Sequence, residues 1–250
     1  KLLPVYLYVY DEFVQDRKYE RELSLIETRL TDLGIAGKIA RLALFRDAHE
    51  LIADEIRRGA TTVVAVGNDL TLRKVIDAVA DPSVVVAIIP LGPDNAIADI
   101  LGVPMGVLAC DILSARLVDD LDGGSVNGMR FLHVVTAEGV QPSCTIEGNY
   151  TLTPMRSSKL FIRNLAASAD LGTANPTDGK LEFVMQTPER TWLVKTVDRV
   201  TSIPFTHLLL KSPSPMKLLV DGEVLDGTEF DIKVLPRQMR IVTGKERKYV

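Results

Sequence analysis

Apolar runs rich in Val, Ile and Tyr alternate with amphipathic segments over the first 122 residues, and this alternation constrains the fold most strongly. In the amphipathic segments, apolar residues such as Leu23, Ile26 and Leu30 recur at helical spacing. This pattern is typical of a parallel sheet covered by helices. The unbroken Val and Ile content of residues 83–92 predicts a strand buried on both faces, in the middle of the sheet. The expected strands are residues 4–10, 37–45, 61–67, 83–92 and 106–110, and the expected helices are residues 16–34, 47–59, 71–80, 95–102 and 111–124.

After Gly124 the apolar residues alternate with a period of two and turn residues become frequent. Short alternating runs between turns are typical of an antiparallel β-sandwich. We therefore expect an α/β plus all-β protein, with a parallel α/β domain over residues 1–122 and a β-sandwich domain over residues 123–250. The expected strands of the second domain are 128–139, 143–154, 158–166, 179–187, 190–198, 207–213, 217–223 and 229–244.

The composition limits which kinds of binding partner we expect for this protein. With 25% charged and 46% hydrophobic residues the chain reads as a soluble globular protein, and its net charge of −4 argues against nucleic acid as a partner. No apolar run reaches the roughly 20 residues that span a bilayer, and no secretory signal is recognisable, so we expect a cytoplasmic protein. The basic segment 244–250 would allow at most peripheral membrane contact, and exposed edge strands of the sandwich would allow a homodimer.

Histidine and cysteine spacing gives little support for other chemistry. His49, His133 and His207 lack the spacing of metal ligands or of a catalytic triad, and we interpret them as helix-surface or strand residues. Cys110 and Cys144 show no CxxC or Cys/His spacing, so we expect reduced, structural cysteines.

The third expected strand ends at Gly67 and is followed by Asn68, Asp69 and Thr71, where a helical pattern begins. A strand that turns into a helix in this way often holds phosphate, because the first amides of a helix are unpaired and carry partial positive charge. The same residues have a second interpretation, since Asn and Asp are favoured N-cap residues. Asn68 or Asp69 could therefore serve only to cap the helix, and both interpretations stay open here.

Several motifs, in a fixed order, resemble those of the diacylglycerol kinase catalytic-domain family, which includes bacterial lipid kinases and sphingosine kinases. Residues 67–71, Gly-Asn-Asp-Leu-Thr, stand where the family has Gly-Gly-Asp-Gly-Thr, and residues 90–96, Pro-Leu-Gly-Pro-Asp-Asn-Ala, stand where it has Pro-Leu-Gly-Thr-Gly-Asn-Asp. The Leu-Gly-Val-Pro run at 101–104, the Val-Asn-Gly run at 126–128, the Asp-Gly-Lys-Leu run at 178–181 and the Asp-Gly-Glu turn at 221–223 follow in the family's order. Ordered matches of this kind are more specific than any single glycine motif.

The resemblance implies a fold of the NAD kinase and diacylglycerol kinase type, and ATP- and Mg²⁺-dependent transfer of a phosphoryl group to a hydroxyl of diacylglycerol or a related lipid or small molecule. Asp221 would be the base and Glu223 its neighbour at the metal, which Asp69 would also bind. The nucleotide-binding residues that it implies are Gly67, Asn68, Asp69, Thr71, Gly92 and Asn95. A second interpretation of the Asp221 turn stays open, because Asp-Gly is also a favoured two-residue hairpin turn and recurs at residues 226–227.

Four departures from the family pattern favour an alternative function. Leu70 replaces a glycine that can adopt a left-handed conformation, which a leucine adopts only with strain. Pro93 removes an amide donor, and Asp94 could offer its carboxylate to the amides of the helix that follows. Asp11 and Glu12 stand where the family has an Asn-Pro and a Ser-Gly step. The alternative is a catalytically inactive relative, or pseudoenzyme, that keeps the fold as a binding or assembly module.

Overall fold

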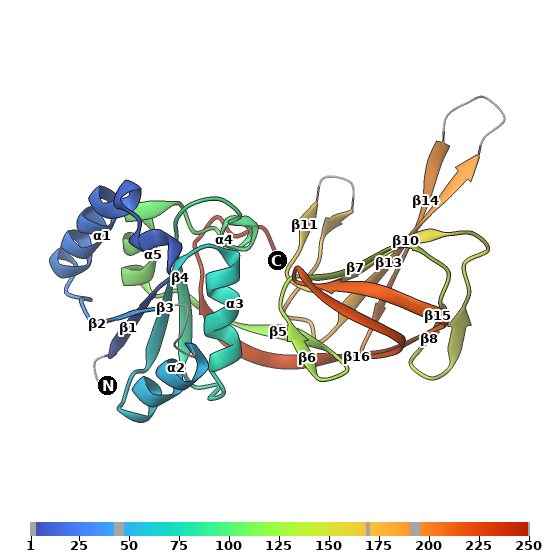
Figure 1. Cartoon of the computed structure of the whole chain (residues 1–250), viewed down its shortest axis with the longest axis horizontal. Coiled ribbons are helices and arrows are strands. Elements are labelled where there is room, and N and C mark those ends of the chain that lie inside the picture. The colour runs from blue at the N-terminus through green and yellow to red at the C-terminus, as the bar shows by residue number, and fades with distance from the viewer. Residues whose placement is uncertain (1–3, 43–47, 169–170, 191–195, 250) are drawn as a thin grey trace. The chain divides into compact units, whose positions relative to one another are not determined.

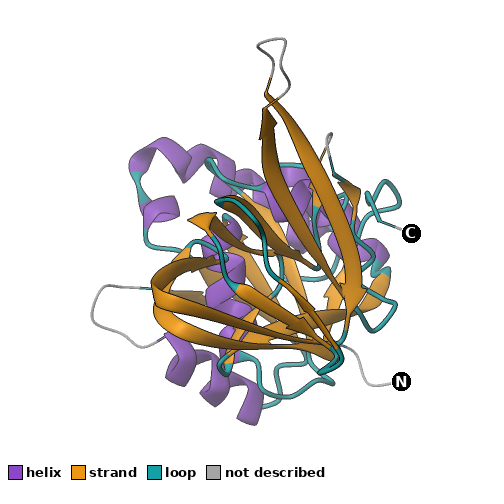
Figure 2. Cartoon of the chain, turned by 90° about the vertical axis from the view of Figure 1, so that its right-hand side faces the viewer, coloured by secondary structure: helices purple, strands orange, loops and turns teal. Residues whose placement is uncertain are grey.

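The computed structural model describes residues 4–42, 48–168, 171–190 and 196–249, and it divides into two compact units (Figure 1). Unit 1 holds the chain up to Leu121 together with Gln238–Lys248, and unit 2 holds Asp122–Arg237. Within the described residues, helices occur only in unit 1, and unit 2 is built from strands (Figure 2). The expected fold class, a parallel α/β part followed by an antiparallel β part, is confirmed.

A parallel sheet forms the centre of unit 1, with its strands in the order β2-β1-β3-β4. Every residue of β1, β3 and β4 is buried, which explains why these strands read as continuous apolar runs. The prediction of an interior strand at residues 83–92 is confirmed, because β4 lies between β3 and the end of β16. The strands are β1 (Tyr6–Tyr10), β2 (Lys38–Arg41), β3 (Thr62–Gly67), β4 (Val85–Pro90) and β16 (Glu223–Val242).

The helices of unit 1 each bury an apolar side. Ile26 of α1, Ile52 of α2 and Val75 of α3 have no exposed surface, and burying one such side chain contributes about 1.5–3 kcal/mol. None of the helices in the described residues is long and apolar enough to cross a membrane. The helices are α1 (Glu20–Asp32), α2 (Ala48–Arg57), α3 (Asp69–Ala78), α4 (Ala96–Ile100) and α5 (Ala109–Ala115), with 3-10 turns η1 (Phe13–Gln15), η2 (Arg17–Tyr19) and η3 (Gly106–Leu108).

The strand expected at residues 106–110 is wrong, and the helix expected at 111–124 is correct only as far as residue 115. Helix α5 ends at Ala115 because Arg116 adopts a left-handed conformation with φ of 52°, and β5 then runs from Val118 to Val126. A Cβ atom on Gly124 would lie 2.2 Å from the ring of Phe131, its partner in β6 (Met129–Phe131), so glycine is required for this pairing. Leu117 precedes β5 and Leu121 lies within it. Their spacing of four residues matches a helical period, which is why the sequence pattern predicts a helix here.

Unit 2 is antiparallel. Strands β14, β13, β10, β7, β15 and β16 are neighbours in that order, and β8 and β9 extend from the first part of β15. Because β15 pairs with β8 over residues 208–211 and with β7 over residues 219–220, these strands surround one core, which includes Phe183, Phe205 and Phe230. Residues 191–195 of the strand expected at 190–198 lie outside the described residues. The strands are β7 (Val134–Val140), β8 (Ser143–Ile146), β9 (Tyr150–Leu152), β10 (Ser158–Arg163), β11 (Ala167–Ser168), β12 (Gly172–Thr173), β13 (Leu181–Arg190), β14 (Thr196–Phe205) and β15 (His207–Val220).

Both cysteines are free and buried. Burial raises the pKa of the Cys110 thiol to about 11 and that of the Cys144 thiol to about 12. Thiols that stay protonated at neutral pH are unreactive, which agrees with the structural role expected from the sequence.

The segment Gln238–Lys248 belongs to unit 1, whereas the sequence predicts a single boundary at residue 122. The last part of β16 pairs in parallel with β4, where Arg240 lies beside Val85 and Ile241 beside Val86. After the strand, Gly244 N donates to Leu101 O at 2.8 Å. This return covers the edge of β4, which would otherwise expose unpaired backbone groups.

Substitution of Gly244 tests this docking of the chain end. A Cβ atom there would lie 1.9 Å from the carbonyl oxygen of Gly102, so we expect Gly244→Ala to lower the free energy of unfolding by about 1–3 kcal/mol, as overpacking does. Gly227→Ala is the control, because the nearest neighbour of its Cβ would be the movable Phe230 ring at 3.2 Å. Urea denaturation measures both, and equal midpoints would contradict the docking.

Candidate functional site

The candidate nucleotide site lies where the chain leaves β1 and β3. Strand β2 lies on one side of β1 and β3 on the other, so the winding of the chain reverses between β1 and β3. In open parallel sheets, ligands bind beyond the carboxyl ends of the strands at such a point. Asp11 follows β1 and Asn68 follows β3, and Asp11 N donates to Val66 O at 3.1 Å. Two polar residues are therefore held next to each other at this edge of the sheet.

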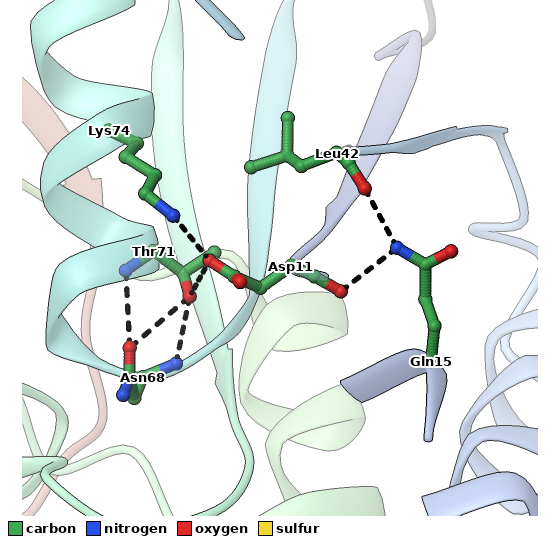
Figure 3. Close-up of polar contacts among 6 residues, drawn as sticks. All are labelled: Asp11, Gln15, Leu42, Asn68, Thr71 and Lys74. Atoms are coloured by element: carbon green, nitrogen blue, oxygen red, sulfur yellow. Dashed lines mark hydrogen bonds and ion pairs between the residues drawn. The ribbon is translucent and has the colours of Figure 1, made fainter. Parts of the chain in front are cut away.

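Asp11 holds the first turns of α3 (Figure 3). Thr71 Oγ1 donates to Asp11 Oδ2 at 2.9 Å, and Lys74 Nζ donates to the same oxygen at 3.0 Å. Asp11 is only 6% exposed, so these donors and the positive end of α3 compensate for its lost hydration. Gln15 Nε2 donates to the main-chain oxygens of Asp11 and Leu42, which holds the loop after β1. The sequence marks Asp11 only as a departure from the family pattern, although an acidic residue directly after an apolar strand can signal such a contact.

The loop after β3 is a helix cap. Asn68 Oδ1 accepts from Thr71 N at 3.3 Å and Thr71 Oγ1 accepts from Asn68 N at 3.1 Å, which together form a capping box. A Cβ atom on Gly67 would lie 2.2 Å from Thr71 Oγ1, so the glycine makes room for this hydroxyl. Leu70 lies in the first turn of α3 and its side chain is exposed, so the strain expected of a left-handed leucine does not arise. The capping interpretation of Asn68 is confirmed.

Asp69 connects the loop after β3 to the loop after β4. Its carboxylate oxygens lie 3.1 and 3.2 Å from Ile97 N, which donates to them, and Asp69 N donates to Asp94 O at 3.0 Å. The expectation that the Asp94 carboxylate accepts from this helix is wrong, because the Asp94 side chain is exposed and Asp69 takes that place. Asp94 adopts φ of 64°, a left-handed conformation that is uncommon for residues other than glycine.

Gly92 and Asn95 shape the second loop. A Cβ atom on Gly92 would lie 2.8 Å from the Phe13 ring and 2.9 Å from the Tyr19 hydroxyl, so this glycine allows close packing against η1 and η2. Asn95 Nδ2 donates to Gly92 O at 2.8 Å. Asn95 Oδ1 is buried and accepts no hydrogen bond from any described residue, which is unusual for a buried polar atom.

The structure brings the six predicted nucleotide residues together on these two loops of unit 1. Leu91 N donates to Gly67 O at 2.7 Å, which links the loops directly. The other two predicted residues, Asp221 and Glu223, belong to unit 2. Among the described residues, no three His, Cys, Asp or Glu side chains gather closely enough to hold a metal ion by themselves.

Asp221 forms the turn between β15 and β16. Asp221 and Gly222 have φ of 45° and 90°, and Val220 pairs with Glu223, which is the geometry of a two-residue hairpin. The Asp221 carboxylate also accepts from the amides of residues 132–134: Leu132 N at 2.8 Å, His133 N at 3.1 Å and Val134 N at 2.7 Å. The hairpin interpretation is thus correct, and the sequence does not reveal the three amides.

Substitution of Thr71 tests the contact with Asp11. Thr71→Val removes both the cap and a donor to the buried carboxylate, so we expect it to lower the free energy of unfolding by about 2 kcal/mol. Thr71→Ser keeps the hydroxyl and is expected to lose about half of that or less. Urea denaturation of the three proteins provides the comparison, and a valine variant as stable as the serine variant would rule out the contact.

The two Asp-Gly turns of unit 2 allow a matched comparison. Asp221→Asn places an NH₂ group among three amide donors, and we expect a loss of about 2–4 kcal/mol in the free energy of unfolding. Asp226→Asn, at an exposed position of the second Asp-Gly pair, is expected to change it by about 0.5 kcal/mol or less. Equal stabilities of the two variants would show that the amide contacts contribute nothing.

Comparisons with known proteins agree with this geometry. Residues 6–126 match the model of the diacylglycerol kinase catalytic domain. An uncharacterized protein of Synechocystis is 24% identical over 91% of this chain and 67% of its own length. A Pseudomonas aeruginosa protein named probable lipid kinase YegS-like is 36% identical over 36% of this chain, but the match spans only 30% of that protein.

The fold also has a solved counterpart. The crystal structure of a diacylglycerol kinase from Bacillus anthracis matches with a TM-score of 0.78 and 16% identity, covering 96% of this chain and 97% of the other. At this identity the likeness concerns the fold. The resemblance found in the sequence is confirmed: just under half of the chain, residues 6–126, is similar to the diacylglycerol kinase catalytic domain.

Proposed function

We propose that this protein is a cytoplasmic lipid kinase that transfers the γ-phosphoryl group of ATP, with Mg²⁺, to a hydroxyl of diacylglycerol or a related lipid. The observation that carries the proposal is the meeting of the two family loops at the carboxyl ends of β1, β3 and β4. Leu70, which favoured an inactive relative, is accommodated in a regular helix. That departure therefore no longer argues for a lost activity.

The donor set on these loops suits a magnesium nucleotide. Mg²⁺ usually keeps several waters and takes one or two carboxylates together with the phosphates of its nucleotide, so a cage of protein side chains is unnecessary. In the proposal, Asp69 supplies one carboxylate to the metal, and Asn95 belongs to the nucleotide site. ATP bound with Mg²⁺ supplies the phosphoryl group.

Because carboxylates lie at this edge of the sheet, phosphate binding there requires a metal ion. Asp69 and Asp11 both lie at the loops, although the charge of Asp11 is paired with that of Lys74, and neighbouring side chains occupy the space beside Gly67 and Gly92. A bare phosphate about 4 Å from one carboxylate would be repelled by roughly 4 kcal/mol at an effective dielectric constant near 20. A bridging Mg²⁺ reverses the sign of this interaction.

On the acceptor side, the resemblance points to the Asp221-Gly222-Glu223 turn. Glu223 is exposed at the first position of β16, and we propose it as a carboxylate that takes part in metal binding on the acceptor side. We propose Asp221 as the residue that takes part in the proton transfer, as the resemblance implies. Its carboxylate accepts hydrogen bonds from the amides of residues 132–134 and so holds that segment beside the turn.

Calorimetric titration tests the nucleotide site. We expect ATP with Mg²⁺ to bind, and ATP with a chelator to bind on the order of a thousandfold more weakly, as the repulsion requires. Asp69→Asn should weaken binding at least tenfold, whereas Asp77→Asn, on the far part of α3, should leave it unchanged. Transfer of labelled phosphate to diacylglycerol in vesicles then tests the reaction, and absence of binding at millimolar ATP with Mg²⁺ would refute the proposal.

A further inference from the structure

Several main-chain amides of the two nucleotide loops already donate hydrogen bonds within the protein. Asn68 N and Thr71 N each donate to the other residue's side-chain oxygen, at 3.1 and 3.3 Å. Asp69 N donates to Asp94 O at 3.0 Å, and Ile97 N donates to the Asp69 carboxylate. Phosphate binds a helix N-terminus through amides that lack another acceptor. A nucleotide at these loops therefore needs a further source of positive charge.

Lys74 extends toward the loop after β3 from the second turn of α3 (Figure 3). Side chains on a helix point back toward its N-terminus, which accounts for this direction. Lys74 Nζ donates to Asp11 Oδ2 at 3.0 Å, and Thr71 Oγ1 donates to the same oxygen at 2.9 Å. Because the ammonium and the hydroxyl contact one atom, the positive charge of Lys74 lies beside a predicted nucleotide residue.

The ammonium group of Lys74 is fixed in position and still accessible. An ammonium group has three N–H donors, and within the described part of the chain Nζ donates to Asp11 alone. The Lys74 side chain is 50% exposed, whereas Asp11 is buried and held by its own backbone contact with Val66. Asp11 thus anchors the ammonium while the other N–H groups remain available to a ligand.

We propose that Lys74 binds a phosphate group of the nucleotide through these N–H groups, while its contact with Asp11 is kept. This inference rests on the proposed kinase function. Hydrogen bonds between an ammonium group and a phosphate are charge-assisted and stronger than those between neutral groups. Lys74 would supply positive charge that the engaged amides do not, in addition to the charge of Mg²⁺.

A double-mutant cycle separates phosphate binding by Lys74 from mere neutralisation of Asp11. We expect Lys74→Gln to weaken the binding of ATP with Mg²⁺ about 10- to 100-fold, as measured by calorimetric titration. In an Asp11→Asn background there is no carboxylate to neutralise, and the Asn oxygen can still accept from Thr71. We expect Lys74→Gln to weaken binding at least tenfold there as well.

Lys38→Gln is the matched control. Lys38 is also a half-exposed lysine of unit 1 whose Nζ donates to one carboxylate, that of Glu55 at 2.7 Å. It is the first residue of β2, at the amino end of the parallel strands, so its substitution should leave ATP binding unchanged. Urea denaturation of each variant establishes that folded chains are compared.

The possible outcomes distinguish this inference from the kinase function. If the natural chain binds ATP with Mg²⁺ and Lys74→Gln has no effect in the Asp11→Asn background, Lys74 only neutralises Asp11 and the inference is wrong. An equal loss of affinity in Lys38→Gln would also overturn it, because the effect would then come from net charge. Absence of binding by the natural chain would overturn the kinase function itself.

Discussion

The burial of β1, β3 and β4 on both faces is the constraint on which unit 1 depends. Strands without an exposed face must be covered by layers on both sides, and charged residues therefore lie only beyond the ends of these strands. The parallel register brings the carboxyl ends of these strands to one edge of the sheet. Polar residues that are far apart in the sequence, such as Asp11 and Asn68, therefore meet there.

Carboxylates organise both candidate places by binding the backbone or hydroxyl groups of another segment. Asp69 accepts from Ile97 N in unit 1, and Asp221 accepts from the amides of residues 132–134 in unit 2. Carboxylates removed from water require such donors, because losing their hydration is costly. Each contact also connects loops that are distant in the chain. The donors that stabilise the carboxylate therefore also fix the positions of these loops.

One buried acceptor of the candidate nucleotide site lacks a hydrogen-bond partner. Most buried polar atoms in folded proteins are hydrogen-bonded, so an exception invites a functional explanation. Asn95 Oδ1 is such an exception among the described residues of the nucleotide loops.

The sequence by itself determined the fold class and the family resemblance, and it pointed to the loops of the candidate site, because buried strands, helical periods and ordered motifs are local patterns. It failed at residues 106–124, where leucines four apart imitated a helix, and at the chain end, whose place beside β4 depends on pairing with a strand about 150 residues away. Only the tertiary structure decided which group each polar side chain meets. Asp69 rather than Asp94 binds the amide of Ile97, and Asp221 binds three amides, because hydrogen bonds depend on distances between segments that no local pattern records.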